Sequence, residues 1–470
     1  MANIIDYIRW RGDLSTIASP FNDIDSLILS QISMINFKGI IPPPFESGKI
    51  SLADAAELYF SDEDRSSCSL GAIIPPETKE LFMLAGTSKR FGEMVFSGYV
   101  SYTNVDSETQ FAALTVGLED GAHCIIFRGT DDSLVGWKED FNLSFLSPIP
   151  AQTEALKYLE DMSTIFEGSI LLGGHSKGGN LAVYAATKAD VEIQDRIVAV
   201  YNHDAPGFSR EFLSSPEHER IEGKIKTVVP QSSVVGMLFE NKGNYEIVKS
   251  NMSGILQHNP FSWEIVGKEF VKLDSLTEEG QRIAKVMNDW MSSATIEERQ
   301  NFVDALYKIL LATEATTLSE LYADKYAVVR AVKDADKETR NMVFSVLGIL
   351  FEEGGRIFRE NLFGNAKRKS KEGLTEETAA KQLEEAFADA QGVLAEMREG
   401  GEIPDIAAEE PVPVKPVPKP ERIVKTVRVK HKKLPPQKRR RVNTTVPKQG
   451  DFISRLAFIT RQAVLKKTQK

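Results

Sequence analysis

From about residue 78 to about residue 270, short apolar runs alternate with segments in which apolar residues follow helical spacing. This alternation predicts an α/β fold with a mainly parallel sheet, right-handed crossovers and flanking helices. The predicted helices are Phe82–Phe96 and Glu154–Phe166. The predicted strands are Tyr99–Tyr102, Phe111–Leu118, Ala122–Phe127, the apolar run that ends before Gly173, Arg196–Asn202, Lys224–Val229 and Tyr245–Val248.

The pattern changes on both sides of this domain, which we place at residues 76–270. Residues 1–75 mix short helical patterns with loops, and we expect them to pack on the domain. After residue 270 the β-branched runs end, and helical spacing predicts a helical region over residues 271–400. Its predicted helices are Ala284–Met291, Thr295–Ala312, Leu318–Val332 and Thr339–Asn361. We expect this region either to cap the functional site or to mediate oligomerisation.

The last seventy residues have a different composition. Residues 401–450 are rich in Pro and Lys and predict an extended, disordered linker. In residues 451–470, Phe452, Leu456 and Ile459 recur at helical spacing among Lys and Arg, which is typical of a basic amphipathic helix on an anionic membrane. The alternative is a solvated tail with some helix propensity.

The charge of the chain is unevenly distributed. The 470 residues carry a net charge of −10, but residues 411–470 hold 18 Lys and Arg against two acidic residues. The rest of the chain is acidic, which argues against nucleic acid as the substrate of the main domain. The basic tail is expected to contact an anionic membrane surface; the alternative is that it binds nucleic acid non-specifically by neutralising phosphates.

Composition and cysteine usage are those of an ordinary soluble protein. Neither a signal peptide pattern nor an apolar run of about 18 residues is found, so we expect a cytoplasmic location, with the tail as a peripheral anchor at the inner face of the membrane. Cys68 and Cys124 are too few for a disulfide scaffold and lie in no metal-ligand spacing. No metal or organic cofactor is expected.

The candidate chemistry centres on Gly174-His175-Ser176-Lys177-Gly178, which joins an apolar run to a helical pattern. G-x-S-x-G between a strand and a helix is the nucleophile elbow of an α/β-hydrolase. Small residues on the following helix, Ala182, Ala185 and Ala186, would let that helix lie close against a sheet. We therefore predict Ser176 as a nucleophile.

A serine nucleophile needs a histidine base oriented by an acid, and this fold supplies them in the order Ser, acid, His. Three histidines follow Ser176 before the predicted disordered tail: His203, His218 and His258. His218 lies in a polar segment and is expected at the surface. His258 lies in a loop after the last predicted strand, where the fold places its base. We predict His258 as the general base; a loop histidine that caps a turn is the alternative.

The predicted acid is Asp204, in Tyr201-Asn202-His203-Asp204-Ala205-Pro206-Gly207 after the strand that follows the elbow strand. An aspartate that only caps this turn is the alternative. The oxyanion hole is predicted to use the backbone N–H groups of Lys177 and Thr130, the latter in the segment after Ala122–Phe127. Arg128, Trp137 and Asp140 are expected to have structural roles in that segment.

These blocks resemble the class 3 (fungal-type) lipases, and more closely an uncharacterised bacterial branch of that superfamily. Phe127-Arg128-Gly129-Thr130 with Trp137 and Asp140 resembles the oxyanion block, and Gly174–Gly179 resembles the G-H-S-x-G-G elbow. The resemblance covers roughly residues 1–270. It departs at Val228–Gly236, where class 3 lipases usually hold the acid and this chain has no carboxylate. Lys177 stands where these lipases more usually have an apolar residue, but the predicted oxyanion role belongs to its backbone N–H group and not to its side chain.

The resemblance implies a serine hydrolase that cleaves carboxylic esters, with an acyl-ester or lipid substrate. The alternative is a catalytically inactive α/β-hydrolase homologue that acts as a binding or regulatory protein, with the basic tail for membrane or partner contact.

Overall fold

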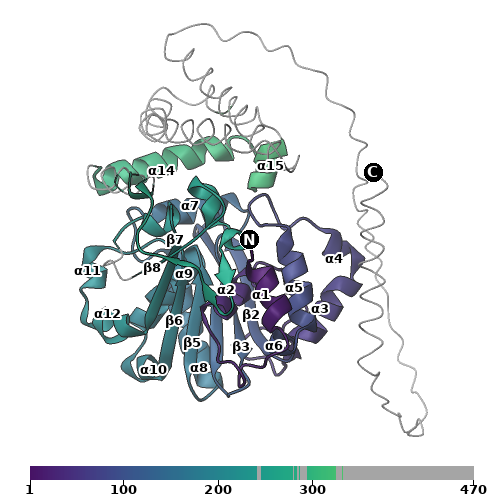
Figure 1. Cartoon of the computed structure of the whole chain (residues 1–470). Helices are drawn as coiled ribbons and strands as arrows, with labels where there is room; N and C mark the ends of the chain where they lie inside the picture. Colours follow the sequence, from purple (N-terminus) through teal and green to yellow (C-terminus); the bar gives the residue numbers. More distant parts are fainter. Residues whose placement is uncertain (241–244, 279, 283–284, 286–293, 324–330, 332–470) are drawn as a thin grey trace, which may run out of the picture. The chain divides into compact units, whose positions relative to one another are not determined.

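The computed structural model describes residues 1–240, 245–278, 280–282, 285, 294–323 and 331. In these residues a nine-stranded sheet has the order β1-β2-β3-β4-β5-β6-β7-β8-β11 (Figure 1). Neighbours from β4 to β8 pair in parallel, and the outer neighbours pair antiparallel. The strands are β1 Ile50–Ser51, β2 Val95–Asn104, β3 Thr109–Gly117, β4 His123–Phe127, β5 Ile170–His175, β6 Ile197–His203, β7 Ile225–Pro230, β8 Glu246–Val248 and β11 Lys272–Leu273.

A separate hairpin and a set of helices complete the described part of the chain (Figure 1). The hairpin pairs β9 (Ile265–Val266) with β10 (Glu269–Phe270). The helices are α1 Ile4–Arg11, α2 Asp23–Ile32, α3 Leu52–Ser61, α4 Glu63–Ser67, α5 Glu77–Thr87, α6 Lys89–Gly92, α7 Leu134–Asn142, α8 Pro150–Ile165, α9 Lys177–Lys188, α10 Val191–Arg196, α11 Arg210–Leu213, α12 Pro216–Ile221, α14 Ile296–Leu311 and α15 Leu318–Ala323. Short 3₁₀ turns include η3 (Gly254–His258).

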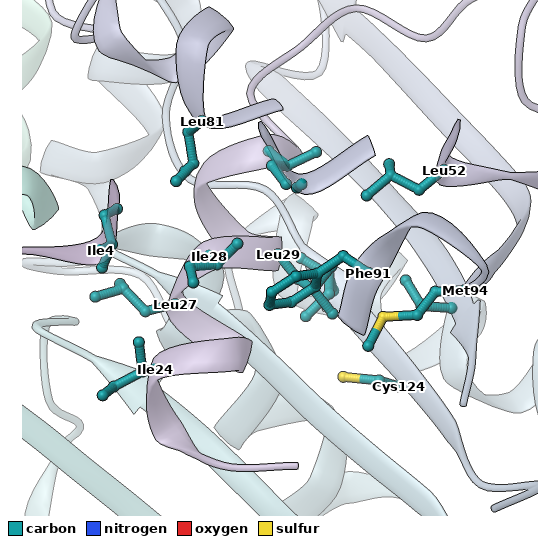
Figure 2. Close-up of a cluster of buried hydrophobic side chains, with 14 of the residues drawn as sticks. Ile4, Ile24, Leu27, Ile28, Leu29, Leu52, Leu81, Phe91, Met94 and Cys124 are labelled. Carbon is teal, nitrogen blue, oxygen red and sulfur yellow. The ribbon is translucent and has the colours of Figure 1, made fainter. Parts of the chain in front are cut away.

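The sheet separates two hydrophobic cores. Successive residues of a strand point to opposite faces, so Leu171 joins one core while Ile170 and Leu172 join the other. The first core contains side chains of α1, α2, α3, α5 and α6; Figure 2 shows Ile4, Leu27, Leu52, Leu81 and Phe91 of these helices, with Cys124 of β4 at one side of the cluster. The second contains side chains of α8, α9 and α12. Helices on both faces of a sheet with five parallel strands give the α/β-hydrolase-like fold that the sequence predicts.

The prediction of a single helix over Phe82–Phe96 was wrong for the second half of that range. Helix α5 ends at Thr87, the Ser88 side chain accepts a hydrogen bond from the Phe91 backbone N–H to begin the short α6, and β2 already starts at Val95. A serine N-cap inside an apolar stretch divides one apparent helix into two. The strands predicted between residues 99 and 248 are all present, with ends that differ by a few residues.

The N-terminal segment is fixed to the domain by a buried ion pair. The Asp25 and Arg90 side chains are both fully buried and form a bidentate pair, in which Arg90 Nε lies 2.6 Å from Asp25 Oδ1. The Tyr7 hydroxyl donates to the same oxygen at 3.0 Å, and the guanidinium also donates to the Ser19 carbonyl at 2.9 Å. One arginine thus ties α6 to α2 and to the loop before it.

Several predicted segments lie outside the described residues: the helix Ala284–Met291 except for residue 285, the helix Thr339–Asn361, the linker of residues 401–450 and the amphipathic helix of residues 451–470. The prediction Thr295–Ala312 corresponds to α14, and the described part of Leu318–Val332 begins with α15. Among the described residues, no helix is long and apolar enough to cross a membrane.

We predict that Arg90→Met lowers the free energy of unfolding by about 3–5 kcal/mol, because it leaves the buried Asp25 carboxylate without its cation. Urea denaturation measures the change. Arg9→Met is the matched control: its pair with Glu80 is about half exposed, so the loss should stay below about 1 kcal/mol. An Arg90→Met protein as stable as the control would contradict the prediction.

Candidate active site

Ser176 occupies a strained turn between β5 and α9. Its backbone has φ 58° and ψ −134°, a conformation that L-residues with a side chain rarely adopt. The turn is fixed by the Ser176 backbone N–H, which donates to the His203 carbonyl at the end of β6 at 3.0 Å. The following N–H groups belong to the first turn of α9, where a helix leaves its donors unpaired and carries a positive dipole end. This is the geometry of a nucleophile elbow.

The segment after β4 lies directly against this elbow. A Cβ placed on Gly178 would lie 2.1 Å from the Phe127 carbonyl oxygen, and one on Gly129 would lie 2.8 Å from the His175 carbonyl oxygen. Both positions therefore require glycine for the two backbones to approach so closely. The contacts place residues 128–133, which we call the β4–α7 loop, beside Ser176 and Lys177.

Asp204 and His258, which are 54 residues apart, meet beside the elbow. The Nδ1 atom of His258 lies 2.7 Å from Oδ2 of Asp204, whose side chain is 1% exposed. The His258 ring also lies against the ring of His175, the residue before Ser176, with 4.4 Å between ring centroids. When Nδ1–H of His258 donates to the Asp204 carboxylate, the other ring nitrogen of a neutral His258, Nε2, is left as a hydrogen-bond acceptor.

The segment Val228–Gly236 has no carboxylate of its own but holds the Asp204 carboxylate in place. The Ser233 hydroxyl and the Gly236 backbone N–H both donate to Oδ1 of Asp204, the latter at 3.1 Å. Asp204 itself has φ 50°, and its backbone N–H donates to the Val228 carbonyl at 2.8 Å. The segment that lacks a carboxylate thus supplies donors to the predicted acid. Sequence analysis did not identify these donors.

In the β4–α7 loop, Thr130 is held by a carboxylate of α7. Its hydroxyl donates to Oδ2 of Asp140 at 2.5 Å, and Arg128 pairs with Asp131 at 2.9 Å. Asp140 Oδ1 is buried and has no hydrogen-bond partner among the described residues. Burial raises the pKa of Asp140 to about 6, and the positive charge of Lys177 opposes this rise. The Thr130 backbone is thereby anchored next to the elbow, where the sequence predicts an oxyanion donor.

The two other histidines considered as bases, His203 and His218, have buried positions. His203 is fully buried and burial lowers its pKa to about 3, so it is neutral at pH 7. The expectation of a surface position for His218 was wrong. It is only 4% exposed, because it belongs to α12, and its Nδ1 lies 3.3 Å from the Thr187 hydroxyl of α9. A polar sequence around a histidine does not reveal that its helix packs on another.

The described part of the helical region packs on α7. The Leu134 backbone N–H donates to the Thr316 carbonyl, and the Leu318 backbone N–H donates to the Asp132 carbonyl, each at 2.9 Å. Leu134 and Val135 of α7 form a small core with Tyr307 of α14 and Leu321 of α15. Figure 1 shows α14 and α15, in green, beside α7. The helices thus support the β4–α7 loop from the side of α7.

No group of three or more His, Cys, Asp or Glu within the described ranges is arranged to hold a metal ion. The arrangement of side chains instead combines a strained, partly exposed serine, a histidine beside it and a buried aspartate that binds the histidine. Such a set can transfer protons and form a covalent intermediate without a metal.

A family model described as Mbeg1-like matches residues 85–308, just under half of the chain. Over these residues the chain is similar to that lipase-related family. No curated protein matches the chain.

Three solved structures are similar to parts of the chain. The M37 lipase is 14% identical with a TM-score of 0.30, over 47% of this chain and 70% of its own. The native Rhizomucor miehei lipase propeptide complex is 15% identical with a TM-score of 0.24, over 33% of this chain and 57% of its own. A deletion mutant of the same lipase propeptide complex is 14% identical with a TM-score of 0.28, over 47% of this chain and 82% of its own. The fold assignment rests on the strand order and the elbow.

We predict that Gly178→Ala lowers the free energy of unfolding by more than about 2 kcal/mol, because the new Cβ would overlap the Phe127 carbonyl. Gly223→Ala is the control, since a Cβ there meets nothing within 4 Å; its stability should change by less than about 1 kcal/mol. Chemical denaturation of both variants measures the difference. Equal stabilities would mean that the close approach of α9 to β4 is not needed.

Proposed function

We propose that this chain is a serine hydrolase of carboxylic esters. In this proposal Ser176 is the nucleophile, His258 the general base and Asp204 the residue that orients it. The observation that carries the proposal is the hydrogen bond of 2.7 Å between Asp204 and His258, formed beside a serine in a strained elbow. A buried aspartate that only caps a turn has no need of a histidine partner 54 residues away.

The proposed reaction begins with attack of the Ser176 oxygen on the ester carbonyl, while His258 takes the serine proton. The negative charge that develops on the carbonyl oxygen is stabilised by the backbone N–H groups of Thr130 and Lys177. The alcohol leaves with the proton that His258 returns to it. Water then attacks the acyl-enzyme by the same route, and the carboxylic acid is released.

Asp204 has two roles in this scheme. Its Oδ2 accepts from Nδ1 of His258, which fixes the imidazole tautomer and favours the imidazolium that forms in each step. Its Oδ1 is held by Ser233 and Gly236, so the carboxylate keeps one orientation.

The proposed substrate is an acyl ester or lipid, by analogy with the lipases to which the chain is similar. Placement in a bacterial branch of the class 3 lipases belongs to the same proposal and rests on the sequence blocks around Ser176 and Thr130. The second candidate is an inactive homologue that acts as a binding protein. It is favoured by one observation, the packing of α14 and α15 on the helix that follows the β4–α7 loop.

We expect a fluorophosphonate probe to label the full-length protein covalently, because an activated serine attacks phosphorus with loss of fluoride. Ser176→Ala should abolish labelling and leave the melting temperature within a few degrees of wild type, which circular dichroism can check. Mass spectrometry of the labelled peptide should locate the adduct on Ser176. A folded wild type that does not react would favour the binding protein.

We expect Asp204→Asn to lower kcat for a soluble aryl ester by about 10³- to 10⁴-fold, because the amide leaves His258 in the wrong tautomer. The control is Asp195→Asn, at an exposed aspartate of α10 that contacts Arg220 at 3.2 Å. Asp195 precedes the first residue of β6, whereas Asp204 follows its last, so the strand separates the two positions. The kcat of the control should equal that of wild type. If Asp204→Asn hydrolyses the ester at an undiminished rate, another group orients the base.

A further inference from the structure

The side chain of Lys177, the residue after the proposed nucleophile, is buried beneath the elbow. It is 1% exposed, and its ammonium donates to the Gln110 carbonyl at 2.9 Å, to Oε1 of Gln110 at 2.7 Å and to Oε2 of Glu139 at 2.8 Å. An ammonium has three donors, so this one is fully satisfied by fixed partners. The side chain to which the sequence assigned no role is therefore one of the most constrained at the site.

Glu139, the partner in α7, is also fully buried and uses both of its oxygens. Oε2 accepts from the Gln110 backbone N–H at 3.0 Å as well as from Lys177. Oε1 accepts from the Ala151 backbone N–H, at the start of α8, at 2.8 Å. One carboxylate thus ties α7 to β3, α8 and α9, and its tie to α9 is made at the residue that follows Ser176.

The next residue of α7, Asp140, holds the Thr130 hydroxyl in the β4–α7 loop. We propose that Lys177 is a positioning residue: its ion pair with Glu139 fixes α7, and through Asp140 the β4–α7 loop, at the distance from Ser176 that the two oxyanion donors need. The inference rests on the proposed function. It concerns the Lys177 side chain, whereas the oxyanion role of this residue belongs to its backbone.

Stability alone does not explain such a pair. Two buried charges cost several kcal/mol of desolvation energy, and well-packed apolar residues of similar size often stabilise a protein as well or better. A network of directed hydrogen bonds, however, fixes the relative position of α7 and α9 in a way that apolar contacts do not. Displacing reacting groups by about 1 Å can lower a rate about 100-fold.

The pair also acts electrostatically on Asp140. The charged or titratable groups that face this carboxylate are Lys177 of α9, Glu139 of α7 and His258 at the end of η3. Lys177 favours the ionised carboxylate, while Glu139 disfavours it. Ionised Asp140 accepts a stronger hydrogen bond from Thr130 than the neutral acid does. The two members of the ion pair therefore influence the loop in opposite directions as pH falls.

The test compares Lys177→Met, Glu139→Gln and the double variant in the full-length protein. The double variant removes both charges with little change of shape, and so it avoids the uncompensated buried charge of either single variant. Lys138→Met is the matched control. Lys138 lies on α7, next to Glu139. It pairs with Glu108 at 2.6 Å and with Asp304 of α14 at 3.1 Å, on the side of α7 that faces α14 rather than the elbow.

Two measurements separate a positioning role from a structural one. The first is kcat and KM for a soluble aryl ester as a function of pH. The double variant should lose about 10- to 100-fold in kcat with less than about a threefold change in KM. Besides protonation of the general base His258, protonation of Asp140 contributes to the acid limb of kcat. The pKa of Asp140 rises in Lys177→Met and falls in Glu139→Gln, so the limb should move to higher pH in the former and to lower pH in the latter.

The second measurement is amide hydrogen exchange over residues 128–133, which needs no turnover. Exchange in the double variant should be at least about tenfold faster than in wild type. Lys138→Met keeps the small core and the backbone hydrogen bonds that join α14 and α15 to this region, so it should change exchange by less than about threefold. A double variant with wild-type exchange and a kcat within about twofold of wild type would overturn the inference. If wild type has no Ser176-dependent turnover, the proposed function fails, and the exchange comparison alone decides the positioning role.

Discussion

The site depends on one close contact, the approach of the elbow backbone to the end of β4. The Gly178 position lies so near the Phe127 carbonyl that a methyl group would not fit. This contact places the helix that follows Ser176 beside the β4–α7 loop, so the serine and both predicted oxyanion donors share one small volume. The strained backbone of Ser176 persists because β6 binds its N–H and α9 packs on both neighbouring strands.

Around this contact, polar side chains are held in place by hydrogen bonds to other segments of the chain. Asp204 is held by the segment after β7 and itself holds His258, while Asp140 holds Thr130. In each case a buried carboxylate has its orientation set by hydrogen bonds before any substrate arrives. Such preorganisation is the main way in which a protein lowers the energy of a developing charge. The proposed role of Lys177 extends the same arrangement to the position of α7.

Most of the fold could be predicted from the sequence, because strands of a buried parallel sheet are short apolar runs and the elbow motif joins one of them to a helix. The second half of Phe82–Phe96 could not, since a serine cap overrides the apolar pattern there. The candidate Asp204 and His258 were found from their order along the chain. Ser233 and the Lys177 side chain were missed because their contacts join segments 29 and 38 residues apart, which no local pattern reveals.

The packing of α14 and α15 on α7 has a consequence for synthesis of the chain. Every strand from β1 to β8 and the elbow itself are translated before residue 249. The backbone partners of Leu134 and Asp132 are Thr316 and Leu318, which are translated well after these strands. A chain folding from its N-terminus therefore completes the strands around its elbow first and its β4–α7 loop last. During synthesis the strands on both sides of Ser176 are therefore in place before the neighbouring loop acquires its final support.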